Sequence, residues 1–205
     1  GRASAPLTIG DSTIVSCTKG VDLHTDGESE AVELNNVNID TAVAISSDGN
    51  DLVVRNGVLN GSLDINSAIA NVYDVIPLSQ STSLGQIWMW TTHILDVRLG
   101  ASSHSATLEL SVGESWSQTI TGSSAQVALP HAVISDSVTE NSDKVAIIAT
   151  AENLPTLSEE YTFGPGEEEI IQINMISNQA PEVEIIIPDD GFTVMESLPI
   201  EIRGV

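Results

Sequence analysis

Hydrophobic and polar residues alternate with a period of two along much of the chain. Thr107–Val112 alternates without interruption, and Glu169–Met175 does so apart from one doubled apolar position. Strands with one buried face produce this period. No window keeps apolar residues at the i, i+3, i+4, i+7 spacing of a helix over three turns. The pattern therefore predicts strands throughout and no long helix.

Turn-forming residues separate these apolar runs. Asp48–Asn50, Asn56-Gly57 and Gly164–Gly166 combine glycine with Asn, Asp or Pro, and such residues adopt the backbone angles that turns require. Many short strands separated by turns are typical of β-sandwiches and β-solenoids. We therefore predict an all-β fold.

Residues 1–80 are rich in Asn, Asp and small aliphatic residues and are expected to form a short-stranded β domain. Leu34–Ile39, Val54–Leu59 and Ile65–Ile69 each place Asn among aliphatic residues. These segments resemble the coils of parallel β-helix proteins (pectate-lyase-like repeats), where small residues and Asn occupy tight corners. The offsets are about 20 and then about 10 residues, so the period is not steady. A β-helix end piece and an antiparallel meander both remain open.

Residues 84–177 contain at least five further strand-like segments, among them Val97–Val112, Gly122–Pro130 and Lys144–Ala151. Their order resembles the carboxypeptidase regulatory-like (transthyretin-like) sandwich of the wider Ig-like group. In that family a strand ending in Leu-Pro precedes an alternating strand, and a closing strand follows a glycine turn. The resemblance implies a β-sandwich with a structural, non-catalytic role in a modular secreted protein.

Residues 178–205 are similar to the opening of tandem bacterial and archaeal Ig-like repeats. Ala180–Ile187 matches the first strand of such repeats, Pro188–Gly191 the turn, and Leu198–Gly204 the second strand. Two strands cannot bury a sandwich core, so we expect a truncated repeat within a longer modular protein whose neighbouring Ig-like modules are its partners. Alternatively, these strands complete the preceding sheet or are donated to a neighbouring copy.

The charge of the chain excludes several partners. Lys and Arg number 6 against 29 Asp and Glu, which gives a net charge of −23. Nucleic acids and anionic lipids bind basic surfaces, so neither is expected here. No stretch approaches the ~18–20 apolar residues of a membrane span, and no membrane insertion of this segment is expected. The many acidic side chains repel one another, and dissolved salt screens this repulsion. The charge therefore favours an extracellular or cell-surface location in a salty medium.

Cys17 is the single cysteine of the chain. It cannot form an intrachain disulfide, and we expect it to be buried as a small hydrophobic side chain.

One acidic segment is a candidate calcium site. Asp22–Glu33 places Asp22, Asp26 and Glu33 at positions 1, 5 and 12 of the calcium-loop template, with a glycine at position 6. His24 occupies position 3, where Asp or Asn is usual, and neither flank resembles a helix. Calcium bound by these three acids and a solvated acidic loop are the two alternatives, and no other cofactor is expected.

Trp88 and Trp90 are two residues apart and would share one face of a strand. Two aromatic rings on one face suit either stacking on sugar rings of cell-surface glycans or the filling of a sandwich core.

No catalytic motif is complete in this sequence. Gly113–Ser117 lacks the final glycine of G-x-S-x-G, and the four histidines have no zinc-site spacing. We expect a protein that is not an enzyme: a non-catalytic structural or adhesive module of a longer secreted or cell-surface protein. The alternative is a carbohydrate-binding module or an appendage of an extracellular polysaccharide-degrading enzyme.

Overall fold

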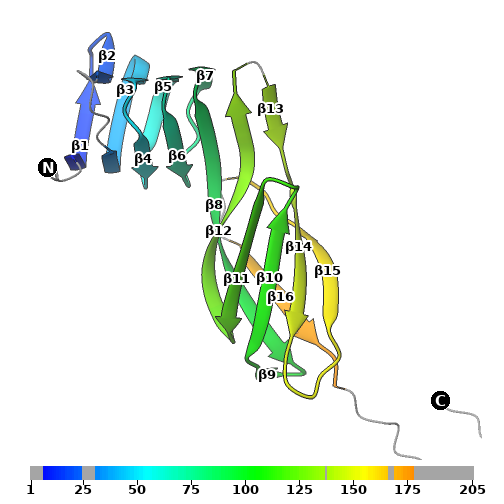
Figure 1. The fold of residues 1–205 in the computed structure, drawn as a ribbon. Helices are drawn as coiled ribbons and strands as arrows, with labels where there is room; N and C mark the ends of the chain where they lie inside the picture. The colour runs from blue at the N-terminus through cyan, green and yellow to red at the C-terminus, as the bar shows by residue number, and fades with distance from the viewer. Residues whose placement is uncertain (1–6, 25–30, 137, 166–168, 178–205) are drawn as a thin grey trace, which may run out of the picture.

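The computed structural model describes residues 7–24, 31–136, 138–165 and 169–177, and these form strands, turns and loops without a helix. The all-β class is thereby confirmed. The strands build one sheet of twelve strands and one of four (Figure 1). No helix that could cross a membrane occurs among the described residues.

The strands of the N-terminal part are β1 (Leu7–Val15), β2 (Lys19–His24), β3 (Val32–Asp48), β4 (Leu52–Arg55), β5 (Val58–Asn66), β6 (Ile69–Tyr73) and β7 (Ser79–Ser83). The strands that follow are β8 (Gln86–Leu99), β9 (Ser102–Ser103), β10 (Ala106–Val112), β11 (Trp116–Gly122), β12 (Ser124–Ser135), β13 (Val138–Asn141), β14 (Lys144–Thr150), β15 (Leu157–Thr162) and β16 (Ile170–Met175).

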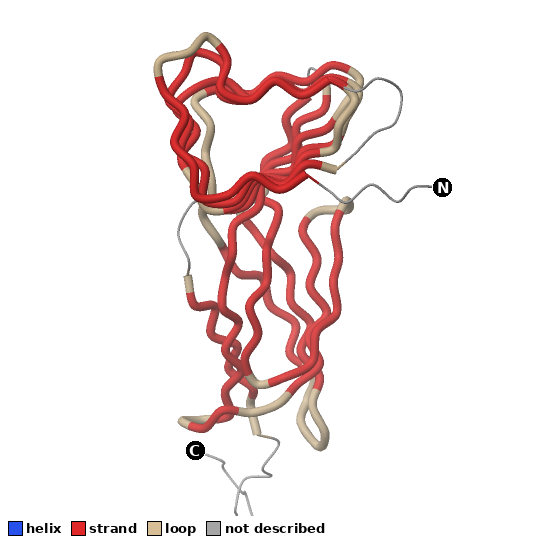
Figure 2. Tube along the Cα trace, turned by 90° about the vertical axis from the view of Figure 1, so that its left-hand side faces the viewer, coloured by secondary structure: helices blue, strands red, loops and turns tan. Residues whose placement is uncertain are grey.

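Strands β1 to β7 and the start of β8 form a stack of parallel coils. Leu7, Val32, Leu52, Ala70 and Ile87 follow one another in register on β1, β3, β4, β6 and β8. The same outline repeats from coil to coil when the stack is viewed along its axis (Figure 2). Of the two alternatives left open by the sequence, the stacked coil is therefore present and the antiparallel meander is wrong.

The unsteady sequence period has a structural cause. The coil shortens from 25 residues between Leu7 and Val32 to 17 residues between Ala70 and Ile87. In addition, Ile65 belongs to β5, the strand that follows β4 on the same coil. Ile65 is paired with Ser47 of β3. A comparison of Val54 with Ile65 therefore compares two sides of one coil and not two successive coils.

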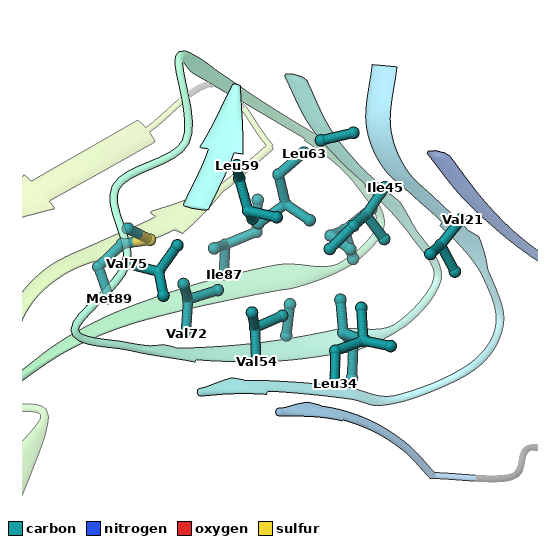
Figure 3. Close-up of a cluster of buried hydrophobic side chains, with 14 of the residues drawn as sticks. Val21, Leu34, Ile45, Val54, Leu59, Leu63, Val72, Val75, Ile87 and Met89 are labelled. Carbon is teal, nitrogen blue, oxygen red and sulfur yellow. The ribbon is translucent and has the colours of Figure 1, made fainter. Parts of the chain in front are cut away.

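The inside of the stack is filled by aliphatic side chains. Leu34, Val54, Val72 and Met89 form one inward row across successive coils, and each is at most 2% exposed (Figure 3). The neighbouring residues on each strand point outward, because side chains alternate between the two faces of a strand. Alternation along each strand thus creates both the core and an outer face.

Asn and Asp mark one corner of the stack. In each of four successive coils, an Asn or Asp comes directly after a residue that is paired in register with the neighbouring coil: Asp11, Asn36, Asn56 and Asp74. All four have positive φ, between 48° and 57°. Asn and Asp tolerate this left-handed conformation better than other side chains with a Cβ. The Asn residues of Leu34–Ile39 and Val54–Leu59 therefore mark one corner that is repeated from coil to coil.

Strands β8 and β12 connect the coil stack to a β-sandwich. They pair antiparallel from Gln86–Ser135 at one end to Asp96–Ser124 at the other, with a register shift between Pro130 and Ala132. The first half of β8 and the last half of β12 pack in the coil core. The other half of each strand packs in a second core, which these strands share with β16 and the four-stranded sheet β11-β10-β14-β15. Both strands thus belong to two cores at once.

Two remaining expectations concern the ends of this architecture. The expectation that Cys17 is buried is wrong, because Cys17 lies exposed in the bend between β1 and β2. Residues 178–205, for which a truncated Ig-like repeat is expected, lie outside the described residues, so that expectation stays a prediction.

Candidate functional site

The outer face of the sheet β3-β4-β6-β8 carries a mixed polar and aromatic row. Asn35, Arg55, Tyr73 and Trp90 are paired in register across these four strands. Trp88 stands beside Trp90 in the next outward row. The stacking of coils thereby brings together residues that are spread over more than fifty positions of the chain.

The aromatic residues of this face stack on one another. The rings of Tyr73 and Trp90 have centroids 5.6 Å apart and planes inclined by 11°, and those of Trp88 and Trp90 are also 5.6 Å apart, inclined by 17°. Trp116 of β11 meets Trp90 edge-on at 6.3 Å. We call Tyr73, Trp88, Trp90 and Trp116 the aromatic stack, and it contains all three tryptophans of the chain.

Trp88 and Trp90 share one face, as their spacing predicts. They are half-buried, and their ring nitrogens are hydrogen-bonded, with Trp90 donating to Asn71 at 3.1 Å and Trp88 donating to Gln86 at 3.3 Å. Their positions are therefore set by neighbours on β6 and β8. Binding of carbohydrate by these two residues stays a prediction.

Arg55 covers the side of the stack that faces the earlier coils. Its guanidinium carbon lies 3.8 Å from the centroid of the Tyr73 ring, in the arrangement of a cation–π contact. Among the described residues, the nearest carboxylate oxygen belongs to Glu33 and lies 3.8 Å from Nε of Arg55. The contact with the ring fixes the guanidinium while 42% of the side chain is exposed.

Asp74 connects the last corner of the coil stack to β8. Its backbone N–H donates to the carbonyl of Trp90 at 3.0 Å. Its carboxylate accepts from the backbone N–H of Thr92 at 2.8 Å and from the Thr92 hydroxyl at 2.6 Å. Because β8 runs straight on into the sandwich at this point, these bonds hold the corner against the continuing strand.

A groove of about 560 Å³ lies between this corner and β12. Its size is within the range of sites that bind small ligands, about 300–1,000 Å³. The groove is lined by two charged side chains of opposite sign, two amides, two hydroxyl-bearing side chains and two small apolar residues: Arg55, Asn56, Tyr73, Asp74, Thr92, Gln126, Val127 and Ala128.

A histidine, His131, lies at the register shift in β12. Nδ1 of His131 is 3.0 Å from the hydroxyl oxygen of the buried Thr91. Burial lowers the pKa of the His131 imidazole below its ordinary value, His93 acts in the same direction, and the charge of Asp74 opposes both. The structure therefore favours the neutral imidazole at this position.

Of the three acids of the candidate calcium site, the structure places Asp22 and Glu33. Asp22 lies on β2, where it accepts hydrogen bonds from Nζ of Lys19 at 3.1 Å, and this contact lowers the pKa of the Asp22 carboxyl. Glu33 lies near the start of β3, whereas Asp22 is paired with Ser46 near the end of that strand. Asp26 lies outside the described residues, and those described contain no group of three or more metal-ligating side chains. Calcium binding stays a prediction.

Sequence reasoning gave no binding role to Arg55, Tyr73 or Asp74. The signal was present as spacing, because Arg55, Tyr73 and Trp90 recur at intervals close to the coil length. The intervals become meaningful only once the coils are known to be parallel.

Comparisons of the chain with protein-family models, curated proteins and solved structures found no match. The class of this protein is therefore given by its architecture: an all-β protein in which parallel coils continue, through two shared strands, into a β-sandwich.

Proposed function

We propose that this chain is a non-catalytic structural module of a secreted or cell-surface protein and acts as a rigid spacer. The observation that carries the proposal is the continuity of β8 and β12, whose side chains fill both hydrophobic cores. A junction without a linker transmits orientation from one part to the other, because bending it requires the β8–β12 ladder to break.

The junction is braced on its outer side as well. Where one core ends and the other begins, β8 and β12 remain paired, with Trp90 opposite Pro130 and Thr92 opposite Ala128. The aromatic stack joins the coil stack, through Tyr73 and Trp90, to Trp116 on the four-stranded sheet. Contacts on both sides of the ladder oppose a hinge motion.

The finer assignment of the sandwich belongs to this proposal. An antiparallel four-stranded sheet packed against β8, β12 and β16 agrees with the Ig-like or transthyretin-like modules that the sequence resembles, and such modules space other domains. The charge of −23 supports an extracellular or cell-surface site of action. Neighbouring modules of the same chain would be the partners of the spacer.

A carbohydrate platform made by Trp88 and Trp90 alone is the weaker candidate. A sugar stacks on an open ring face, whereas these rings lie against each other and against Tyr73. Retention on a glycan affinity gel that is lost in Trp88→Ala, with an unchanged melting temperature, would favour the platform over the spacer.

The exposed single cysteine allows a direct test of rigidity. A spin label on Cys17 and a second one on Ser102→Cys, in β9 at the far end of the sandwich, report the distance across the junction by pulsed electron resonance. The control pair, Cys17 with Ser83→Cys, lies within the coil stack, so the width of its distance distribution shows how much the labels themselves contribute. A distance distribution as narrow as that of the control supports a rigid spacer, and a much broader one contradicts it.

A further inference from the structure

The groove beside Arg55 and Asp74 shares Tyr73 with the brace of the junction, and its polar side chains are arranged for a ligand. We propose that this groove binds a neutral glycan, with Arg55, Asp74 and Gln126 contacting its hydroxyl groups. The proposal goes beyond the spacer function and does not depend on it.

Arg55 differs from the other cations of the described residues. Lys19, Arg98 and Lys144 each donate a hydrogen bond to a carboxylate, at 3.1, 2.8 and 2.7 Å. Arg55 has its nearest carboxylate oxygen, that of Glu33, at 3.8 Å and forms no hydrogen bond within the described part of the chain. In a protein with 29 acidic residues, an arginine that lies on a tyrosine ring and donates no hydrogen bond to any described residue is available to a ligand.

The arginine is also held in place before a ligand arrives. The contact with Tyr73 at 3.8 Å restricts the side chain, so binding costs less rotamer entropy than it would for a free arginine. The planar guanidinium presents several N–H donors in a fixed fork, which suits two adjacent hydroxyl oxygens of a sugar ring.

Acceptors held in place by hydrogen bonds also line the groove. Both oxygens of Asp74 are oriented by Thr92, and each carboxylate oxygen has a further lone pair for a ligand. The exposed Gln126 and the corner residue Asn56 add amide groups that can donate and accept. A hydroxyl group both donates and accepts, so a polyhydroxylated ligand matches this mixed lining better than an apolar or a purely cationic one.

Charge favours a neutral glycan over an acidic one. Arg55 and Asp74 balance each other within the groove, and Glu33 lies beside Arg55. The net charge of −23 opposes the approach of a polyanion. The ligand class inferred is therefore an uncharged polysaccharide.

Affinity electrophoresis of the full chain tests this directly. The gels contain soluble galactomannan, soluble β-glucan or, as the acidic comparison, polygalacturonate, at about 0.05 M and about 1 M NaCl. We expect retardation by at least one neutral polysaccharide and no change with salt. Arg55→Gln is expected to weaken that binding about tenfold or more, the scale of a hydrogen bond to a charged group. Lys144→Gln, which removes the same charge on the four-stranded sheet, is expected to bind as the unmodified protein does.

Several results would overturn the proposal. These are no retardation by either neutral polysaccharide, retardation only by polygalacturonate with an affinity that falls as salt rises, or equal binding by the protein and Arg55→Gln. If Arg55→Gln lowers the melting temperature, Gln126→Ala decides, because Gln126 is exposed on β12 and its loss leaves the aromatic stack intact. Unchanged binding in Gln126→Ala would then reject the groove, while the distance measurement on Cys17 would still judge the spacer independently.

Discussion

Arg55 and Tyr73 are the last residues of β4 and β6, are paired in register, and place a guanidinium 3.8 Å from the centre of a phenol ring. Trp90 of β8 continues this row on the other side of Tyr73. A contact between successive coils is thereby extended to a strand that enters the sandwich. Arg55 and Tyr73 of this row also line the groove, so the brace of the junction and the candidate ligand site share Tyr73.

Trp90 is expected to contribute more to stability than Trp88. Trp90 contacts Tyr73, Trp88 and Trp116, whereas Trp88 contacts Trp90 at the edge of the stack. Trp90→Ala should lower the free energy of unfolding by about 3 kcal/mol, and Trp88→Ala by clearly less. Urea denaturation followed by far-UV circular dichroism measures both, and equal losses would show that the stack does not brace the junction.

The two cores are expected to unfold together. Ile87 and Leu95 are both fully buried on β8, the first in the coil core and the second in the sandwich core. Ile87→Ala and Leu95→Ala should each lower the stability of one common transition by about 2–5 kcal/mol. Thermal unfolding monitored by tryptophan fluorescence and by circular dichroism should give coincident curves in both variants. Two separate transitions, each shifted by only one of the variants, would contradict this prediction.

The corner residue Asn36 is expected to tolerate glycine better than alanine. Its φ of 55° lies in the left-handed region, which costs a residue with a Cβ about 1–2 kcal/mol unless its side chain compensates. Asn36→Ala should therefore lower the free energy of unfolding by about that amount. Asn36→Gly should lose only the hydrogen bond to Asp11 at 2.7 Å. Asn38→Ala, at an exposed strand position of ordinary φ, is the matched control in urea denaturation, and a larger loss in Asn36→Gly than in Asn36→Ala would be inconsistent with corner strain.

His131 is expected to make the protein less stable as the pH falls below neutral. Because burial lowers the pKa of His131 in the folded state below its ordinary value of 6.5, the unfolded chain binds the proton more tightly. The contribution of the neutral imidazole to stability is complete above pH 6.5. It is lost as the pH falls through that value toward the lowered pKa.

The pH dependence can be assigned to this one residue by substitution. His131→Asn keeps a hydrogen-bonding side chain near Thr91 but does not titrate, so the urea midpoint should vary less between pH 7.5 and pH 5 than it does in the unmodified protein. His104→Asn, a substitution of a histidine elsewhere in the chain, is the control. An identical pH profile for His131→Asn and the unmodified protein would remove His131 as the cause.

The spacing of residues in the sequence was sufficient to predict Trp88 and Trp90 on one face, because side-chain alternation along a strand is a local property. It was insufficient for Tyr73 and Asp74, whose neighbours on β8 lie 17 and 18 residues further along the chain. The same limit explains Cys17. An isolated cysteine is most often buried, but only the path of the first coil places this one in an exposed bend.

The sequence by itself determined that the chain folds into strands, and it placed Asn residues where the coils turn. Both are consequences of local chemistry, since alternation creates a buried face and Asn accepts a positive φ. Only the tertiary structure decided that the N-terminal strands stack in parallel and that β8 and β12 serve two cores. Parallel pairing joins segments at changing separations, from 25 residues down to 17, and the energy of packing such distant residues is not encoded in any local pattern.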